Sequence, residues 1–330
     1  MTSLDHLLPA ADETVRCADF ARTIAIDPGG TAIRADRVVL VETGLPWPKP
    51  VFNHPTLREI DPVFKTSSRP TRLLGCRPPS GADDRPATQV WVFDRLDRHT
   101  RERRFDVATP DELLDLSSCL AAESSGDEAT SSQLFEPTFD GPMNHPVVLV
   151  CTQGSHDVCC GSDGERFAQE AELMDTPGLR VFRVSHTGGH RFAPTAMTLP
   201  DGRMWAYLVP DLLKQILGAS TPDGGAAADL APFCRGWWGA DVGPEQVAER
   251  AVFAWVGFSL DHMPRSLTKL GESTYRVETE RTVGGIVEQD RWIIDVELAR
   301  EVPTVACRKP GGLPTKVRRE YRAEIRSGGS

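Results

Sequence analysis

The sequence has no long apolar segment and no excess of positive charge. No stretch approaches the ~18 uninterrupted apolar residues that a membrane-spanning helix needs, and the N-terminus carries Asp and Glu where a signal peptide would be basic and then apolar. Lys and Arg total 37 against 47 Asp and Glu, and this net charge of −10 repels a phosphate backbone. We therefore expect a cytoplasmic protein that neither enters a membrane nor binds nucleic acid.

Several short motifs of common enzyme sites are also missing. We find no G-x-G-x-x-G after a strand, no P-loop, no G-x-S-x-G and no C-x-x-C. These absences exclude a standard nucleotide site, a serine nucleophile in that setting and the usual thioredoxin redox pair. Nothing marks the paired carboxylates of a glycosidase either. The sequence thus offers none of these standard catalytic sites.

Cysteine is sparse but unevenly placed. Eight cysteines in 330 residues are far fewer than a secreted disulfide scaffold uses, so in a reducing compartment they indicate metal binding, catalysis or burial. Three of them gather in one short segment, Cys151, Cys159 and Cys160. The others stand alone and are expected to be small buried apolar residues: Cys17, Cys76, Cys119, Cys234 and Cys307.

The first part of the chain is rich in strand patterns. After a helical N-terminal segment, β-branched and apolar runs predict strands, and Pro followed by acidic residues predicts the start of a helix. The expected strands are 37–43, 71–77 and 88–95, and the helix is 110–122. The polar, small-residue stretch 122–133 is the expected linker.

Past that linker the pattern alternates. We expect a strand, a helix and a second strand, then a hairpin turning at Asp201-Gly202, and a closing helix. The corresponding ranges are 146–153, 164–174, 179–186 and, for the last helix, 210–218. The order β, α, β, β, β, α is that of a minimal thioredoxin-like half.

The last third is expected to add a helix from residue 244 and a β-hairpin with a further strand near 303–307. The Gly-, Pro- and Arg-rich tail is expected to fray. The fold class is thus α/β, a thioredoxin-like domain with an N-terminal strand-rich α+β region and a C-terminal helix plus hairpin. Its expected divisions are 1–133, 134–221, 222–308 and a disordered tail, 309–330. No internal repeat is visible in the sequence.

The candidate functional residues lie in two loops, CTQGSHDVCC at 151–160 and HTGGH at 186–190. Each follows a strand of the expected parallel pair, so both loops should meet at one edge of the sheet. Thiolates and imidazoles suit zinc or an iron–sulfur cluster and not Ca²⁺ or Mg²⁺. Cys151 and Cys160 have eight residues between them, a spacing wider than that of a small zinc finger and suited to wrapping a two-iron cluster.

Other residues of these loops are candidates for supporting roles. Gly188 and Gly189 permit positive φ and let the backbone come close to inorganic sulfide. His156 is either a supporting residue or an exposed loop residue, and Arg191 either offsets charge or pairs with a surface carboxylate. Cys159 is a ligand, a reserve ligand or a buried thiol.

These motifs carry a resemblance. CTQGSHDVCC and VSHTGGHRFAP, with GTA and LVETGLPWP nearer the N-terminus, resemble the sucrase/ferredoxin-like family of thioredoxin-like [2Fe-2S] proteins over most of the chain. The resemblance implies a ferredoxin domain in which H-x3-H replaces the second cysteine pair. By that match Cys151 and Cys160 would ligate one iron and His186 and His190 the other. It would then be an electron-transfer or redox-sensing protein rather than a stand-alone catalyst, with unidentified redox donor and acceptor proteins as its partners.

The implied ligand set has an electrostatic consequence. Two thiolates and two neutral imidazoles give an oxidised [2Fe-2S] centre a charge of 0 rather than −2, so its potential should rise, as in Rieske centres. An imidazole open to solvent can take up a proton on reduction, which predicts a pH-dependent midpoint potential.

Two alternatives remain open. The same residues fit a structural zinc site in an interaction protein. Cys159 or Cys160 could instead be the nucleophile of a thiol-dependent oxidoreductase, which requires a depressed thiol pKa.

Overall fold

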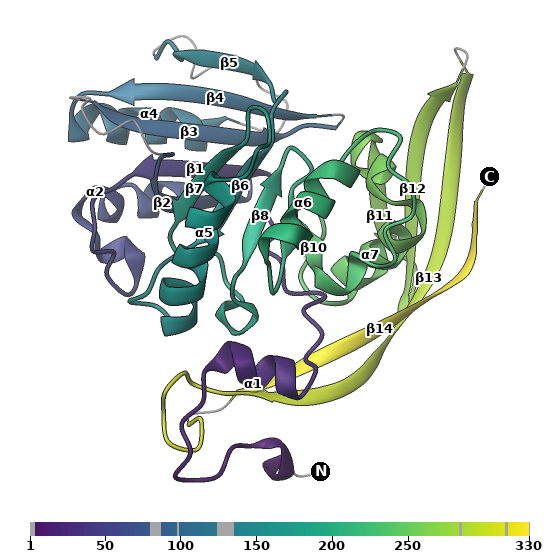
Figure 1. Ribbon diagram of the computed structural model, residues 1–330. Helices are drawn as coiled ribbons and strands as arrows, with labels where there is room; N and C mark the ends of the chain where they lie inside the picture. The colour runs from purple at the N-terminus through teal and green to yellow at the C-terminus, as the bar shows by residue number, and fades with distance from the viewer. Residues whose placement is uncertain are drawn as a thin grey trace.

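The computed structural model describes residues 4–79, 87–97, 99–123, 135–283, 286–313 and 316–329. It is a mixed α/β structure with one ten-stranded sheet and a separate four-stranded antiparallel sheet (Figure 1). Almost all of the expected linker at 122–133 lies outside the described residues.

Residues up to 142 form the first half of the large sheet. Strand β1 pairs in parallel with β2 and antiparallel with β3, which continues antiparallel into β4 and β5. The strands are β1 (Arg37–Glu42), β2 (Thr71–Arg77), β3 (Thr88–Arg95), β4 (Thr100–Val107) and β5 (Phe139–Pro142). The helices are α1 (Cys17–Thr23), α2 (Pro55–Arg58), α3 (Asp61–Lys65) and α4 (Pro110–Ala122).

The second half follows the expected order β, α, β, β, β, α. Strand β6 pairs in parallel with β7 and antiparallel with β8, which pairs with β9. The elements are β6 (Val147–Cys151), α5 (Glu165–Glu172), β7 (Arg180–Val184), β8 (Ala196–Leu199), β9 (Arg203–Trp205) and α6 (Pro210–Ala219). The predicted strands, helices and Asp201-Gly202 turn of this region are therefore confirmed.

The two halves repeat one arrangement. The strand order is β10-β9-β8-β6-β7-β2-β1-β3-β4-β5, so β9-β8-β6-β7 mirrors β4-β3-β1-β2, and the halves join through antiparallel β2 and β7. Each half has a parallel pair followed by an antiparallel hairpin and a helix. The sequence shows no repeat because only the order of apolar segments recurs, not the residues.

The C-terminal part adds one strand to the large sheet and builds the small one. The elements are β10 (Cys234–Trp237), α7 (Pro244–Val256), β11 (Arg265–Lys269), β12 (Thr274–Val283), β13 (Ile286–Thr304) and β14 (Lys316–Gly329). The large sheet is continuous across the expected divisions at 133 and 221, because β5 pairs with β4 and β10 with β9.

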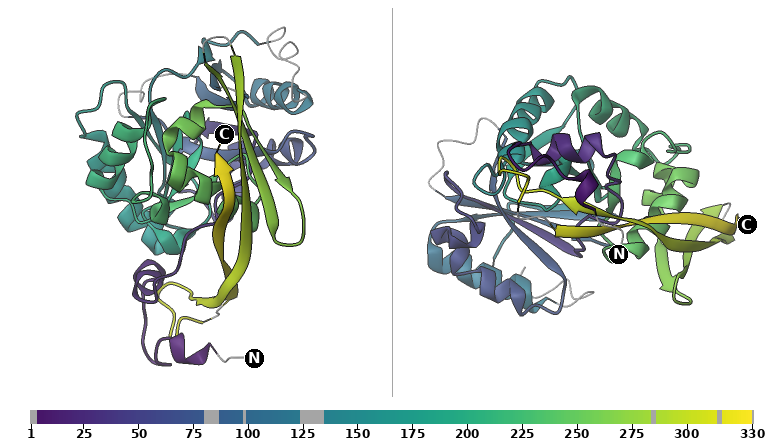
Figure 2. Two further views of the ribbon diagram at one scale, coloured as in Figure 1. Left: turned by 90° about the vertical axis from the view of Figure 1, so that its right-hand side faces the viewer. Right: turned by 90° about the horizontal axis from the view of Figure 1, so that it is seen from below.

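The expectation of a frayed tail at 309–330 is wrong, since β14 pairs along β13. Its residues alternate, and Tyr321, Ala323 and Ile325 pack against the core while their neighbours face outward. This two-residue period is hidden in the sequence by the many arginines. Figure 1 and Figure 2 show β13 and β14 curving from beside α7 to α1, so the loop after β13 lies beside α1, whereas the C-terminus lies at the far end of β14.

Apolar side chains form several buried clusters around the sheets. One lies under α2, α3 and α4, a second under α5, α6 and α7, and a third joins apolar residues of both halves. In the described part of the chain, none of the helices is long and apolar enough to cross a membrane. The packing leaves the carboxyl ends of β6 and β7 as neighbours, which positions the site.

Candidate metal centre

The loops after β6 and β7 meet because their strands are parallel neighbours. Cys151, the last residue of β6, lies in register with Val184, the last residue of β7. Within the loop after β6, Cys160 begins a short π-helical turn, Cys160–Gly164, that leads into α5. The sequence prediction that these two loops lie together is confirmed.

Cys151, Cys160 and His186 form the first group of potential ligands. Their ligand atoms all lie within 4.8 Å of one another, and both thiols are fully buried. The Cys160 thiol hydrogen-bonds to Cys151 and, with the nearby His186 ring, holds the Cys151 pKa well below its ordinary value despite burial. The same interaction and burial raise the pKa of Cys160. The arrangement favours a thiolate inside the protein.

His186 has a nitrogen that the protein itself does not satisfy. Its Nδ1 is buried and has no hydrogen-bond partner among the described residues. A buried polar atom without a partner costs free energy unless a ligand completes it. Two buried thiols beside this imidazole are soft donors, so the group fits an iron–sulfur cluster or zinc.

His190 lies at the edge of this group rather than within it. Its ring centre is 6.0 Å from that of His186, and its Nδ1 lies 3.0 Å from Asp157 Oδ2 and 3.3 Å from Cys17 Sγ. The His190 imidazole, with the other contacts of the carboxylate, lowers the pKa of Asp157 to about 2 against the effect of burial. The side chain is 31% exposed, so it forms part of the protein surface.

His156 covers His186. The two rings stack with centres 3.5 Å apart and planes inclined by 14°. Burial, together with the neighbouring His186 and Lys49, lowers the pKa of His156 to about 3, so this ring is neutral at physiological pH. It therefore shields His186 without adding charge.

Gly188 and Gly189 give the second loop its turn, with φ values of +82° and +68°. A Cβ on Gly189 would lie 2.5 Å from the guanidinium of Arg235, which donates to the Gly188 carbonyl at 3.2 Å. Arg235 is fully buried and also hydrogen-bonds Thr31, in the GTA segment. Burial lowers the pKa of Arg235 to about 9, which leaves it charged at pH 7 near the two buried thiols.

Arg191 does not pair with a surface carboxylate through its Nε. This atom is buried with no partner among the described residues, and burial lowers the pKa of the side chain to about 10. The guanidinium lies 4.3 Å from the ring centre of Phe192, so a cation–π contact holds it.

The Pro-rich segment of the first half braces the loop after β6. Gln153 accepts the backbone N–H of His186 at 2.9 Å and donates to the Pro48 carbonyl at 2.6 Å. Ser155 donates to the Trp47 carbonyl at 2.5 Å. The segment LVETGLPWP thus holds both ligand loops in place.

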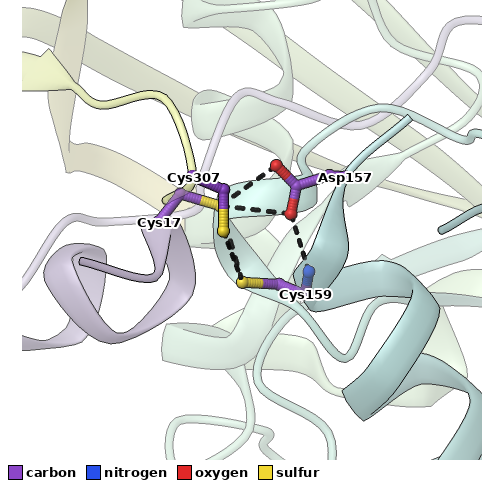
Figure 3. Close-up of side chains that lie close together, drawn as sticks. All are labelled: Cys17, Asp157, Cys159 and Cys307. Carbon is purple, nitrogen blue, oxygen red and sulfur yellow. Dashed lines mark hydrogen bonds between the residues drawn. The ribbon is translucent and has the colours of Figure 1, made fainter. Parts of the chain in front are cut away.

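A second group of potential ligands lies beside the first, formed by Cys17, Asp157, Cys159 and Cys307 (Figure 3). Their ligand atoms also lie within 4.8 Å of one another. The hydrogen bond from Cys17 lowers the pKa of Cys159 to about 6, although burial opposes the shift. Cys159 therefore belongs with this group and not with Cys151.

The expectation that Cys17 and Cys307 stand alone is wrong. Cys17 is buried as expected and Cys307 is half-buried, but each contacts other potential ligands. Spacing could not reveal the group, since 142 and 148 positions separate these residues from Cys159. Only the return of β13 to α1 brings them together.

A cavity of about 420 Å³ lies elsewhere, between the large sheet and the small one. Its lining includes Trp237, Asp201 and Arg265 but none of the candidate ligands. It is therefore separate from both groups.

Comparison with protein families gives a match over residues 28–236, to the family described as sucrase/ferredoxin-like. The chain belongs to the sucrase/ferredoxin-like family. Comparisons with curated proteins and with solved structures found no match. The part of the chain that matches the sucrase/ferredoxin-like family contains Cys151, Cys160, His186 and His190, and leaves out Cys17 and Cys307.

Proposed function

We propose that this chain is an electron-transfer or redox-sensing protein that carries a [2Fe-2S] cluster. Cys151 and Cys160 would hold one iron, and His186 and His190 the other. The cluster would supply one-electron oxidation and reduction. The observation that carries the proposal is the buried group of Cys151, Cys160 and His186, whose ligand atoms converge in a chain of this family.

The position of His190 supports an extended cluster over a single zinc ion at this place. The four ligand atoms of one tetrahedral zinc lie about 3.3–3.8 Å from each other. The ligand atoms of Cys151, Cys160 and His186 lie within 4.8 Å of one another, and His190 is not among these converging residues. A ligand set spread in this way suits two metal ions better than one.

Asp157 is suited to orient His190. A metal-bound imidazole commonly donates its second ring N–H to a carboxylate, which fixes the tautomer and the ring plane. Asp157 Oδ2 lies 3.0 Å from His190 Nδ1, which leaves Nε2 as the free nitrogen for a metal. Asp157 is thus a positioning residue in this proposal.

Two buried guanidinium groups balance the negative charge of the thiolates. Arg235 remains charged at neutral pH and interacts electrostatically with Cys151 and Cys160. Arg72 is close enough to Cys151 to interact with it, and it donates to the His186 carbonyl at 2.5 Å. These positive charges favour retention of an added electron.

We assign this centre to a thioredoxin-like ferredoxin domain over residues 134–221, supported by the parallel β6–α5–β7 unit and the β8–β9 hairpin. We also propose that it acts in the cytoplasm between a redox donor and an acceptor protein. All eight cysteines are free thiols, which suits a reducing compartment.

The alternative of a thiol-dependent oxidoreductase has less support. Cys159 has the lowered pKa that this alternative requires, but Cys159 and Cys160 are both fully buried, whereas a nucleophile must reach its substrate.

The test is metal analysis of anaerobically purified protein carrying His186→Ala or His190→Ala, with Cys119→Ser as the matched control. Cys119 is a free cysteine on α4, outside both groups. We expect each histidine variant to lose iron and visible absorption while the control keeps both. Full retention of iron in both histidine variants would exclude the proposed ligand set.

A further inference from the structure

The second group of ligands brings together three separate segments of the chain. Cys17 comes from α1, Asp157 and Cys159 from the loop after β6, and Cys307 from the loop after β13 (Figure 3). Three of the four side chains are buried. Apart from Asp157, which orients His190, the proposed electron-transfer function requires none of these residues.

Its distances match those of a tetrahedral metal site. Cys159 Sγ lies 3.7 Å from Cys17 Sγ and 3.5 Å from Cys307 Sγ. Cys17 Sγ lies 3.4 Å from Asp157 Oδ1. Thiolates and a carboxylate bound to one zinc ion, at ~2.3 and ~2.1 Å, lie about 3.6–3.8 Å apart.

We propose that Cys17, Asp157, Cys159 and Cys307 bind a structural zinc ion, separate from the iron–sulfur centre. Four protein ligands leave no open position, so the ion would be structural rather than catalytic. A disulfide between two of the three cysteines explains the group less well. Its sulfur atoms would have to come within ~2.05 Å of each other, and the third thiol would remain unpaired.

The surroundings of the sulfur atoms support thiolate ligands. The backbone N–H groups of Ala18 and Cys17 hydrogen-bond to the sulfurs of Cys159 and Cys307, respectively. The guanidinium of Arg16 hydrogen-bonds Cys159 and Asp163. Its positive charge offsets part of the excess negative charge that three thiolates and a carboxylate leave on a zinc site.

The zinc would fasten α1 and the loop after β13 to the loop that carries Cys160. These two segments also contact each other directly, since Arg308 N–H donates to the Val15 carbonyl at 2.9 Å. Asp157 connects the two sites, because its Oδ2 contacts His190 while its Oδ1 accepts the Cys159 N–H at 2.8 Å. Cys17 and Cys307 lie outside the residues matched to the family.

The experiment is zinc and iron analysis of the full chain produced with both metals, with Cys17→Ser and Cys307→Ser compared with Cys119→Ser. We expect one zinc per chain in the unchanged protein and the control, and at least about a tenfold loss of zinc in each of the two variants. Zinc retained by both variants would overturn the proposal. Iron is measured on the same samples, so failure of the zinc site is distinguishable from failure of the iron site.

X-ray absorption spectroscopy at the zinc edge tests the site in the unchanged protein, and so does not depend on whether the variants fold. We expect about three sulfur neighbours near ~2.3 Å and one oxygen neighbour near ~2.1 Å. A protein without zinc, a zinc without sulfur neighbours, or a Cys17–Cys159 disulfide in the mass spectrum of reductant-free protein would each contradict it.

Discussion

Cys159 and Cys160 are adjacent in the sequence, yet their sulfur atoms belong to different ligand groups. Successive residues of a helical turn point in different directions, so one side chain faces Cys151 while the other faces Cys17. A single short loop can thus serve two metal sites.

This division gives a prediction at the level of single atoms. Cys160→Ser should remove iron and keep zinc, whereas Cys159→Ser should remove zinc and keep iron. Metal analysis of the two variants, prepared side by side, measures the outcome. Loss of the same metal from both variants would show that the two groups do not act separately.

Asp201 predicts a pH-dependent stability. Burial and nearby Asp261 raise its pKa to about 7, and Thr198 Oγ1 donates to its Oδ2 at 2.9 Å. Because the unfolded carboxyl titrates near ~3.9, the folded chain holds the extra proton between these values. The stabilising contribution is therefore fully present below about pH 4 and is lost as pH rises to about 7, by at most ~4 kcal/mol.

Asp201→Asn stays neutral and should lack this loss. The free energy of unfolding of the variant, minus that of the unchanged protein, should therefore be larger at pH 8 than at pH 5. Urea unfolding at the two pH values measures this difference. Asp229→Asn, at an exposed position, is the matched control and should show no such difference. Equal effects of Asp201→Asn at both pH values would contradict the shifted pKa.

At the residue scale the sequence correctly predicts that the members of the first group lie close together. Cys151, Cys160 and His186 follow parallel strands, and strand topology brings such positions together. It does not predict Cys17 or Cys307, because no local pattern records the contact between α1 and the loop after β13. The contact of His190 with Asp157 also depends on side-chain packing that spacing does not encode.

At the element scale, the turn of the HTGGH loop depends on glycine. Alanine at Gly189 would hold a left-handed φ of +68° and place its Cβ against Arg235. The conformation alone costs ~1–2 kcal/mol. We expect Gly189→Ala to lower the free energy of unfolding by at least this amount and to reduce iron content.

Gly218→Ala is the control for that experiment. Gly218 lies in α6 with open space around the added Cβ, so the change should be neutral or stabilise by up to ~1 kcal/mol. Urea unfolding and iron analysis measure both variants. If Gly189→Ala behaved like Gly218→Ala, the loop would not need its observed conformation.

Strand β14 offers a second test at this scale. Tyr321 packs against the core, whereas Val317 on the same strand is 57% exposed. Tyr321→Ser should lower the free energy of unfolding by ~2–4 kcal/mol, and Val317→Ser by less than ~0.5 kcal/mol. Equal, small effects in denaturant titrations would indicate that the tail does not pair with β13.

The elements that the sequence predicts are those with uninterrupted apolar or clearly capped patterns, such as β1, β6 and α4. Strand β4 is missed because its sequence, TRERRFDV, is mostly charged. Its Arg103 is nonetheless buried, in ion pairs with Asp94 and Glu123. Such pairing is invisible in a local pattern, since the partners lie on β3 and just after α4.

On the scale of the whole molecule, two similar halves carry different roles. The first half has no thiol at the end of β1, where the second has Cys151 at the end of β6. The loop after β1 instead contributes Trp47 and Pro48 to bracing the ligand loop of the second half. In the proposed function, the second half therefore holds the ligands of the iron–sulfur centre and the first half fixes their position.

Metal and sulfide analysis of the anaerobically purified full chain, before and after dithionite, determines whether the chain carries a [2Fe-2S] cluster. We predict two irons and two acid-labile sulfides per chain, with a red-brown spectrum that bleaches on reduction. A colourless protein that contains zinc but no iron, and that takes up no cluster on reconstitution with iron and sulfide, would contradict it.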